Sequence, residues 1–337
     1  MVLPVIQTSD EFLHARLHGL WAVSVHGETL RGMTALGTVE SLEQALHPFG
    51  VTDSDAFHRS LLIRELERLE RISRFLQEDM AAVYRVVASH VQFRNLKLLL
   101  HRHFFPERSR RLEPLVVHHR ILPELDVSAL LEATSTAAFL AALPKSLLPR
   151  MTPIVEAMAD SGDIMAAECT MDKLYYDLLL EAVSGARSAF RKAMEGLMRH
   201  MVDAFNLTIL LRNERHYDYA TSRLENLWAD GGSMTAPFLS RLADMDDPAA
   251  MLSLLPRPYR DLLLPLHSQE IHVSENALLN AVYHRAHAEF KASRKAWGAL
   301  AAYPFLLHVE TLNLGRLYEG IRLAMQPEAI QTMMIGL

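Results

Sequence analysis

A polar phrase built around an Asn-Leu pair occurs three times in this chain of 337 residues. Each copy has a carboxylate or an amide three residues before the asparagine and a polar or charged residue six residues after it. The asparagines lie 111 and 107 residues apart, in a chain that has only seven of them. The copies run from Gln92 through Asn95 to His101, from Asp203 through Asn206 to Arg212, and from Glu310 through Asn313 to Glu319.

The spacing inside the phrase indicates a helix. Residues three and six apart fall on roughly one side of a helix, so each copy predicts three polar groups on one side of an apolar helix. Asparagine is a poor residue for a helix interior, because its amide competes for backbone hydrogen bonds. Recurrence at a nearly fixed distance therefore predicts a structural unit that is built three times.

A second phrase repeats at a matching distance. The segment from Leu130 to Leu148 resembles the segment from Leu242 to Arg260, 112 residues further on, and a weaker version spans 36–46. In each, Ser, Thr or Asp precedes a short apolar stretch, as expected of a helix N-cap, and a proline follows soon afterwards. We therefore predict three helical units, 1–115, 116–230 and 231–337, with the Gly231-Gly232-Ser233 turn as the clearest boundary.

The composition agrees with an all-α fold. Half of the residues are hydrophobic and strand patterns are nearly absent. Long stretches with apolar residues at helical spacing span 57–87, 171–212, 274–302 and 305–325. In the first of these, the alternating charges from Arg64 to Arg71 predict a solvated helix face.

Charge and composition also limit the partners. The net charge is −6 with both signs interspersed and no long basic run, so we expect no nucleic acid partner. The one cysteine, Cys169, fits a reducing cytosol, and we read no signal peptide in the first residues. No apolar stretch reaches the ~20 residues that span a bilayer. We predict a soluble protein that reaches a membrane only through its partners.

Taken together, these phrases resemble the C subunit of prokaryotic V/A-type rotary ATPases, whose eukaryotic counterpart is the V-ATPase d subunit. The segment from Phe12 through Arg16 to Gly19 is similar to the opening helix of that family. The second and third Asn-Leu copies resemble its Asp-x-x-Asn-Leu and Glu-x-x-Asn-Leu motifs, and the acidic helix start at Asp172 is also similar. Gln92 and His101 stand where the pattern has an acid and an arginine, and Gly315 moves the last arginine to Arg316.

The resemblance implies three similar helical units arranged as a funnel around a pseudo-threefold axis. It implies a non-catalytic rotor subunit, cytoplasmic and peripheral at the membrane, between the membrane proteolipid ring and the central shaft. Such a subunit needs no cofactor. The sequence does not decide between proton and sodium coupling, or between ATP synthesis and hydrolysis.

We interpret the motif residues as structural, because a buried amide must find hydrogen-bond partners. Candidate partners are Asp203 with Arg212 and Glu310 with Arg316. The full set of motif residues is Arg16, Asn95, Asp172, Asp203, Asn206, Arg212, Glu310, Asn313 and Arg316. The basic cluster Arg108, Arg110 and Arg111 is a candidate contact with acidic partner surfaces or lipid headgroups.

Two alternatives stay open. One is a helical repeat scaffold with unrelated partners, since stacked helical units present concave binding surfaces. The other is a metal-dependent enzyme on the histidine pairs His14/His18 and His284/His287, the first at zinc-helix spacing. Neither pair has the glutamate beside its first histidine that a zinc hydrolase helix needs, so we expect no metal.

The sequence also contains no phosphate loop or nucleophile elbow, and Cys169 is expected to be a packed thiol. The apolar tail 331–337 is expected either to fold back onto the body or to contact a partner.

Overall fold

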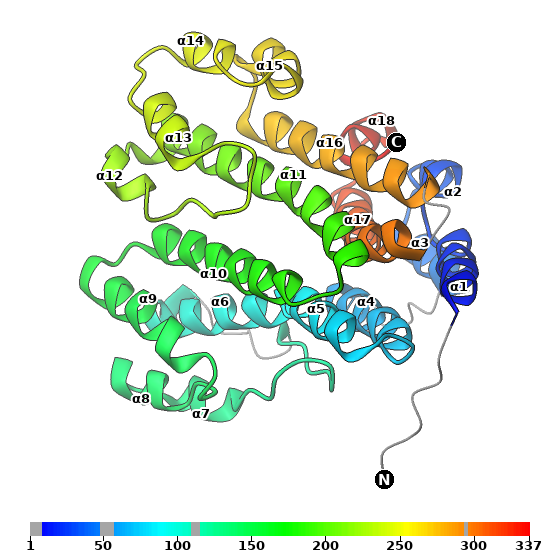
Figure 1. Cartoon of the computed structure of the whole chain (residues 1–337), viewed down its shortest axis with the longest axis horizontal. Coiled ribbons are helices and arrows are strands. Elements are labelled where there is room, and N and C mark those ends of the chain that lie inside the picture. The colour runs from blue at the N-terminus through cyan, green and yellow to red at the C-terminus, as the bar shows by residue number, and fades with distance from the viewer. Residues whose placement is uncertain (1–8, 48–56, 109–114, 293–295) are drawn as a thin grey trace. The chain divides into compact units, whose positions relative to one another are not determined.

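The computed structural model describes residues 9–47, 57–108, 115–292 and 296–337. In these ranges the regular elements are helices, and none of the described residues lies in a β-strand (Figure 1). The predicted all-α fold class is therefore confirmed. None of the helices in these ranges is both long and apolar enough to cross a lipid bilayer.

The chain forms two compact units. The smaller unit contains residues 53–184, and the larger unit contains 1–52 together with 185–337. These limits differ from the predicted repeat boundaries at 115/116 and 230/231, because compactness and internal repetition are different criteria. The division into three similar units, and their funnel arrangement, stay predictions.

In the smaller unit, α10 is central and packs against α5, α6 and α9. Its core is formed by apolar residues such as Phe93, Phe139 and Met171, all of them buried. The helices are α4 (Phe57–Ser73), α5 (Glu78–Ala88), α6 (His90–Phe104), α7 (Val127–Glu132), α8 (Thr136–Ala141), α9 (Leu148–Ser161) and α10 (Ile164–Ser184), with a 3-10 turn at Pro106–Arg108.

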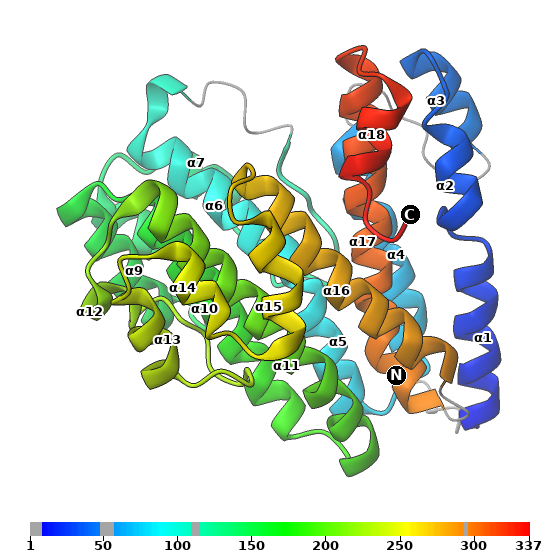
Figure 2. The same ribbon diagram turned by 90° about the horizontal axis from the view of Figure 1, so that it is seen from above.

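In the larger unit, α17 is central and packs against α1, α11, α16 and α18 (Figures 1 and 2). Gln331 of α18 donates a hydrogen bond of 2.9 Å to the Thr34 hydroxyl after α2, so the C-terminal and N-terminal segments meet. The helices are α1 (Asp10–Ala22), α2 (Gly27–Met33), α3 (Val39–Leu46), α11 (Ser188–Arg212), α12 (Thr221–Leu224), α13 (Ala236–Ala243), α14 (Pro248–Ser253), α15 (Arg257–Leu263), α16 (Ile271–Ala292), α17 (Ala296–Arg322) and α18 (Pro327–Met333). A π-helical turn at Asn213–Tyr217 follows α11, and a 3-10 turn at Leu264–Leu266 follows α15.

The predicted N-caps of the second phrase are confirmed. Thr38, Ser135 and Asp247 precede α3, α8 and α14, and each side chain accepts a hydrogen bond from a backbone N–H of the first turn. Such a cap satisfies one of the four N–H groups that have no partner within the helix. Pro144 and Pro256 follow α8 and α14 within a few residues, while Pro48 lies outside the described residues.

The long apolar stretches are shorter as helices than their periodicity suggests. The stretch 57–87 divides between α4 and α5, and 171–212 divides between α10 and α11. Pro304, in contrast, lies inside α17 and is buried. A proline removes one helical hydrogen bond, and packing of α17 against α1, α3, α11, α16 and α18 offsets that loss. The predicted solvated face of α4 is wrong in part, since Arg64, Glu65 and Arg68 are buried.

Candidate functional site

The three repeated asparagines make the same pair of contacts. Each side-chain amide donates to the carbonyl of one residue and accepts from the N–H of that same residue, which lies 22 or 23 positions further along the chain. The pairs are Asn95 with Val117 (2.8 and 3.0 Å), Asn206 with Ala229 (3.0 and 2.9 Å) and Asn313 with Ile335 (2.8 and 2.9 Å).

In each copy these two bonds fix the segment that follows the helix and runs back beside it. All three asparagines are at most 3% exposed, so the amide replaces water for both main-chain groups. The acids and arginines that the sequence offers as candidates are therefore not the partners of these amides, and the one side-chain partner is Gln92, which accepts from Asn95 at 3.1 Å. In the third copy the anchored residue belongs to the apolar tail, which therefore folds back onto the body, one of its two predicted placements.

The residue three positions before each asparagine bonds to residues other than the one that the asparagine holds. Asp203 is fully buried and accepts four hydrogen bonds. Its donors are the Ser233 N–H (2.7 Å), the Ser233 hydroxyl (2.5 Å), the Met234 N–H (3.2 Å) and the Tyr259 hydroxyl (3.0 Å). Burial, and then the charge of Asp203, raise the pKa of Tyr259 above its ordinary value, so this hydroxyl stays a donor.

The other two copies use this position in related ways. Glu310 accepts a hydrogen bond of 2.8 Å from the Val25 N–H, and Gln92 donates one of 2.8 Å to the Pro123 carbonyl. In all three copies the contacted segment leads directly into a pair of short helices: α7 and α8 after Pro123, α13 and α14 after Met234, and α2 and α3 after Val25. The third copy therefore takes its partner from the N-terminal part of the chain, 285 residues away.

The basic residues of the motifs bond to residues of other helices. His101 lies 2.7 Å from Glu168 of α10, and the Arg212 guanidinium donates to Glu275 of α16 at 2.5 Å. Each of these glutamates is the fifth residue of its helix. Arg316, shifted along the third motif, donates instead to the Asn276 side chain at 2.8 Å and to the Met333 carbonyl at 2.5 Å.

The remaining predicted residues lie apart from these contacts. Asp172 lies inside α10, so the predicted helix start at this residue is wrong, and it accepts from Lys97 of α6 at 2.6 Å. Arg16 is half-buried on α1. Arg108 ends the 3-10 turn after α6, and its side chain is not described. Arg110 and Arg111 lie outside the described residues. Their contact with a partner stays a prediction.

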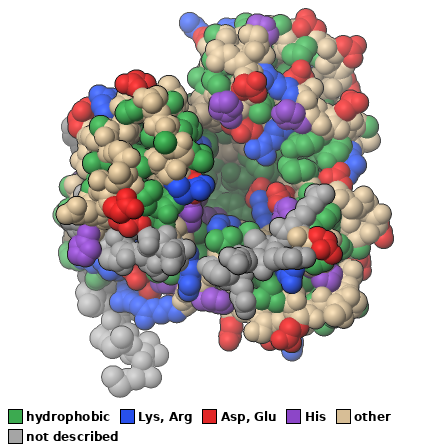
Figure 3. Space-filling view, turned by 180° about the vertical axis from the view of Figure 1, so that it is seen from behind, with side chains coloured by type: hydrophobic (Ala, Val, Ile, Leu, Met, Phe, Trp, Pro, Cys, Tyr) green, Lys and Arg blue, Asp and Glu red, His purple; other side chains and the backbone are tan. Residues whose placement is uncertain are grey.

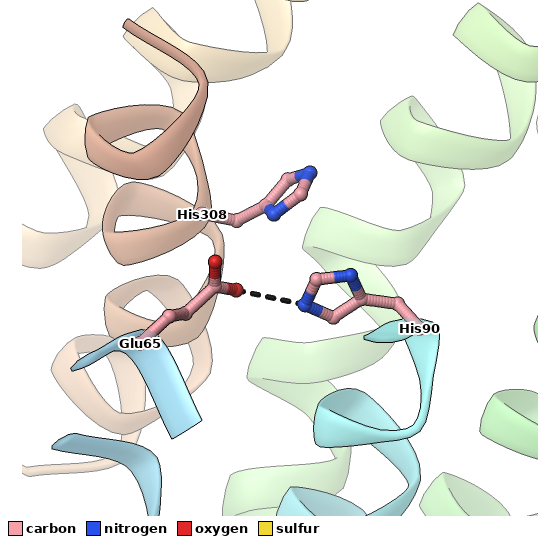
Figure 4. Close-up of side chains that lie close together, drawn as sticks. All are labelled: Glu65, His90 and His308. Carbon is pink, nitrogen blue, oxygen red and sulfur yellow. Dashed lines mark hydrogen bonds and ion pairs between the residues drawn. The ribbon is translucent and has the colours of Figure 1, made fainter. Parts of the chain in front are cut away.

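Two contacts of buried groups have no signal in the sequence. Glu65 of α4 and His90 of α6 point toward each other, with a carboxylate oxygen 2.8 Å from the ring nitrogen (Figure 4). Tyr259 of α15 donates a hydrogen bond to Asp203, which lies 56 positions before it in the chain. Both pairs depend on how helices pack, and neither follows from helical spacing along one segment.

The histidine pair at i and i+4 does lie on one face of α1. The rings of His14 and His18 are 4.3 Å apart between centroids, and His18 also contacts the Phe290 ring of α16 at 4.4 Å. Burial and the neighbouring His14 lower the pKa of His18. Burial, and then the charges of Lys291, His26 and His284, lower the pKa of His287 on α16.

The lowered pKa values of His18 and His287 predict that stability falls as the pH falls. A His18→Gln, His287→Gln double variant is expected to lose less unfolding free energy than the original chain when the pH falls from 7.5 to 5.5. The folded chain keeps both rings neutral below the ~6.5 at which unfolded histidine takes up a proton, so acid favours the unfolded state. Chemical denaturation at the two pH values measures this, with exposed His272→Gln as the control. An unchanged pH dependence in the double variant would contradict the assignment.

The end of the chain packs closely against α16. Gly336 has φ +80°, and a Cβ added there would overlap the Tyr283 ring. Gly336→Ala is therefore expected to lower the unfolding free energy by about 2 kcal/mol through strain and overpacking. Thermal unfolding checks this against Gly196→Ala in α11, where a Cβ meets nothing within 4 Å. The control should be neutral or stabilising by up to ~1 kcal/mol, because alanine favours a helix over glycine. Equal effects at both sites would contradict close packing.

The charged side chains on the face drawn in Figure 3 do not gather into one large patch of a single sign. Acidic and basic side chains alternate there with hydrophobic and other groups. The motif carboxylates, amides and bases instead bond to the chain itself. The fold and these contacts define an all-helical protein in which one polar phrase anchors the chain three times.

A sequence model of the ATP synthase (C/AC39) subunit family matches residues 21–333. The chain belongs to this family, that of a subunit of V/A-type rotary ATPases, as the Asn-Leu phrases predict. No curated protein matches the chain in sequence.

Proposed function

We propose that this chain is a non-catalytic central-rotor subunit that couples the membrane proteolipid ring to the central shaft, for ATP-linked proton or sodium transport. The observation that carries the proposal is the family match over residues 21–333. The proposal includes a cytoplasmic place at the membrane surface and three similar units, 1–115, 116–230 and 231–337, arranged as a funnel. The match does not favour the alternative of a scaffold with unrelated partners.

The contacts of the motif residues support a mechanical role. A body that transmits torque must resist deformation, and the repeated phrase places a buried two-bond anchor in each of its three copies. The buried acids Asp203 and Glu310 then hold the segments that lead into the short helices. The asparagine amides and these two carboxylates form their hydrogen bonds within the chain, so we expect other residues to contact the partners.

Co-expression with the candidate shaft and ring subunits of the same source tests the proposal. A tagged chain is expected to co-purify with both, and its omission is expected to uncouple ATP hydrolysis from ion transport in reconstituted vesicles. A chain that binds neither subunit, or coupled transport without it, would contradict the rotor role.

We further propose that Arg108, Arg110 and Arg111 contact acidic partner surfaces or lipid headgroups near the ring. Reversing these three charges is expected to reduce co-purification with the ring, because rim charges guide association and register. Reversal of three arginines of α13 and α15, Arg241, Arg257 and Arg260, is the matched control. Unchanged recovery of the ring with the first set would contradict the contact.

A further inference from the structure

Histidine and aromatic rings alternate where α1 meets α16, and all of these residues belong to the larger unit. Five of the 17 histidines of the chain lie here, and we refer to them as the histidine cluster. They are His14 and His18 of α1, His26 before α2, and His284 and His287 of α16. Neither the family match nor the motif contacts assign a role to this cluster.

The rings form a continuous series of contacts between the two helices. His18 contacts the Phe290 ring at 4.4 Å between centroids. Trp21, on the next turn of α1, contacts Phe290 at 6.1 Å and His287 at 6.3 Å. His26 stacks on the other end of this series, with its ring 4.3 Å from that of Trp21 and 2° between the planes. The contact between α1 and α16 is therefore made largely by rings that can take up a proton.

A proton added to His18 has no acceptor to bond to. The Nε2 atom of His18 is buried, and no described residue forms a hydrogen bond with it. A protonated imidazole donates from both ring nitrogens, so this atom would become a buried N–H group without a partner. Such a group costs free energy, and the closed contact therefore favours the neutral ring.

The charges nearest to the cluster also oppose protonation. His14 acts on His18, while Lys291, His26 and His284 act on His287, and all of these groups are basic. Among the described residues, no carboxylate forms an ion pair with His18 or His287. A second positive charge in the closed contact is therefore not neutralised there.

Other ionisable groups lie on the helices that pack at this contact. Glu28 of α2 pairs with Arg31, and Glu310 of α17 accepts from the Val25 N–H, so both carboxylates are already engaged. The others are Asp10, Glu11 and Arg16 of α1, Tyr283, Arg285 and Glu289 of α16, and Tyr303 and His308 in the nearby part of α17.

We propose that the histidine cluster is an acid-sensitive switch, at which α1 separates from the body locally while α11 and α17 stay folded. α1 lies at the edge of the larger unit in Figure 2. Its outward face is already exposed at Phe12, Ala15, Gly19 and Val23, so contacts on one face hold it in place. Elements with few buried contacts open at a lower free energy than the core.

The direction of the switch follows from where the protons bind. Leu13, Leu17 and Trp21 are buried and oppose opening, so the open state is rare at neutral pH. In the open state the histidines take up protons at their ordinary pKa of ~6.5, whereas the pKa values of His18 and His287 are lowered in the closed contact. Opening therefore binds protons and becomes more favourable as the pH falls below ~6.5.

Hydrogen exchange of the intact chain at pH 7.5 and 5.5, followed by mass spectrometry, tests the proposal. After correction for the intrinsic exchange rate, the amides of α1 are expected to be less protected than those of α11 and α17 at both pH values. Their protection is expected to fall about tenfold at pH 5.5, since each histidine kept neutral in the closed contact contributes at most about tenfold between these pH values.

A His18→Gln, His287→Gln double variant should reduce this fall to about twofold or less, because it removes the two groups that bind protons on opening. His272→Gln, at an exposed position near the start of α16, is the matched control and should keep the full pH dependence. Exchange in low concentrations of urea adds a second measurement. Opening of α1 alone exposes little surface, so its exchange should depend less on urea than that of α11 and α17.

Equal protection and equal urea dependence of α1, α11 and α17 would overturn the proposal, because α1 would then open only with the whole unit. Protection of α1 that does not change with pH, or that changes equally in the double variant, would overturn it as well. If the double variant does not fold, the pH and urea dependence of α1 in the original chain decides the matter.

Discussion

Replacing Asp203 with alanine is expected to lower the unfolding free energy by about 4 kcal/mol. The variant loses hydrogen bonds from two backbone N–H groups and from two hydroxyls, and hydrogen bonds to a charged group contribute about 1.5–3 kcal/mol each before compensation. The Ser233 and Met234 N–H groups then lack an acceptor where α13 begins. Chemical denaturation with far-UV circular dichroism measures the change.

Two further variants show how large the effect of Asp203→Ala is compared with the loss of one hydrogen bond and with a change at the surface. Tyr259→Phe removes one donor and leaves the carboxylate with three, so a loss of about 1 kcal/mol is expected. Asp230→Ala, at an exposed position in the same loop, should change stability by less than ~0.5 kcal/mol. If Asp203→Ala and Asp230→Ala have the same effect, the four contacts do not stabilise the fold.

Asn206→Ala is expected to lower the unfolding free energy by about 3 kcal/mol, and with it the melting temperature by about 4 °C. The change removes both bonds to Ala229 and leaves a buried N–H and a buried C=O without partners. Thermal unfolding followed by circular dichroism measures the shift. Exposed Asn226→Ala is the matched control, because Asn226 makes one bond at the surface.

This experiment also separates structure from assembly. If the amide serves the fold, the melting temperature falls first, and any loss of binding to the ring or the shaft follows from that. Weaker rotor assembly with an unchanged melting temperature would show instead that Asn206 contacts a partner.

The sequence predicts the helices and the repeated phrase because both depend on local periodicity. Thr38, Ser135 and Asp247 could be assigned as N-caps since a cap and its N–H partner lie within three residues. The breaks inside long apolar stretches were not predictable in the same way. Pro304 continues a helix where a proline usually ends one, because packing against five neighbouring helices stabilises α17.

The sequence by itself determined that the chain is all-α, that a polar phrase recurs three times, and that the family is that of a rotary ATPase subunit. These properties follow from residue order and spacing. Only the tertiary structure decided what each polar group bonds to, because, apart from the bond between Gln92 and Asn95, those partners lie 17 to 285 positions away. Tertiary packing also distinguished the first copy from the other two: where Gln92 replaces a carboxylate, the returning segment borders a pocket.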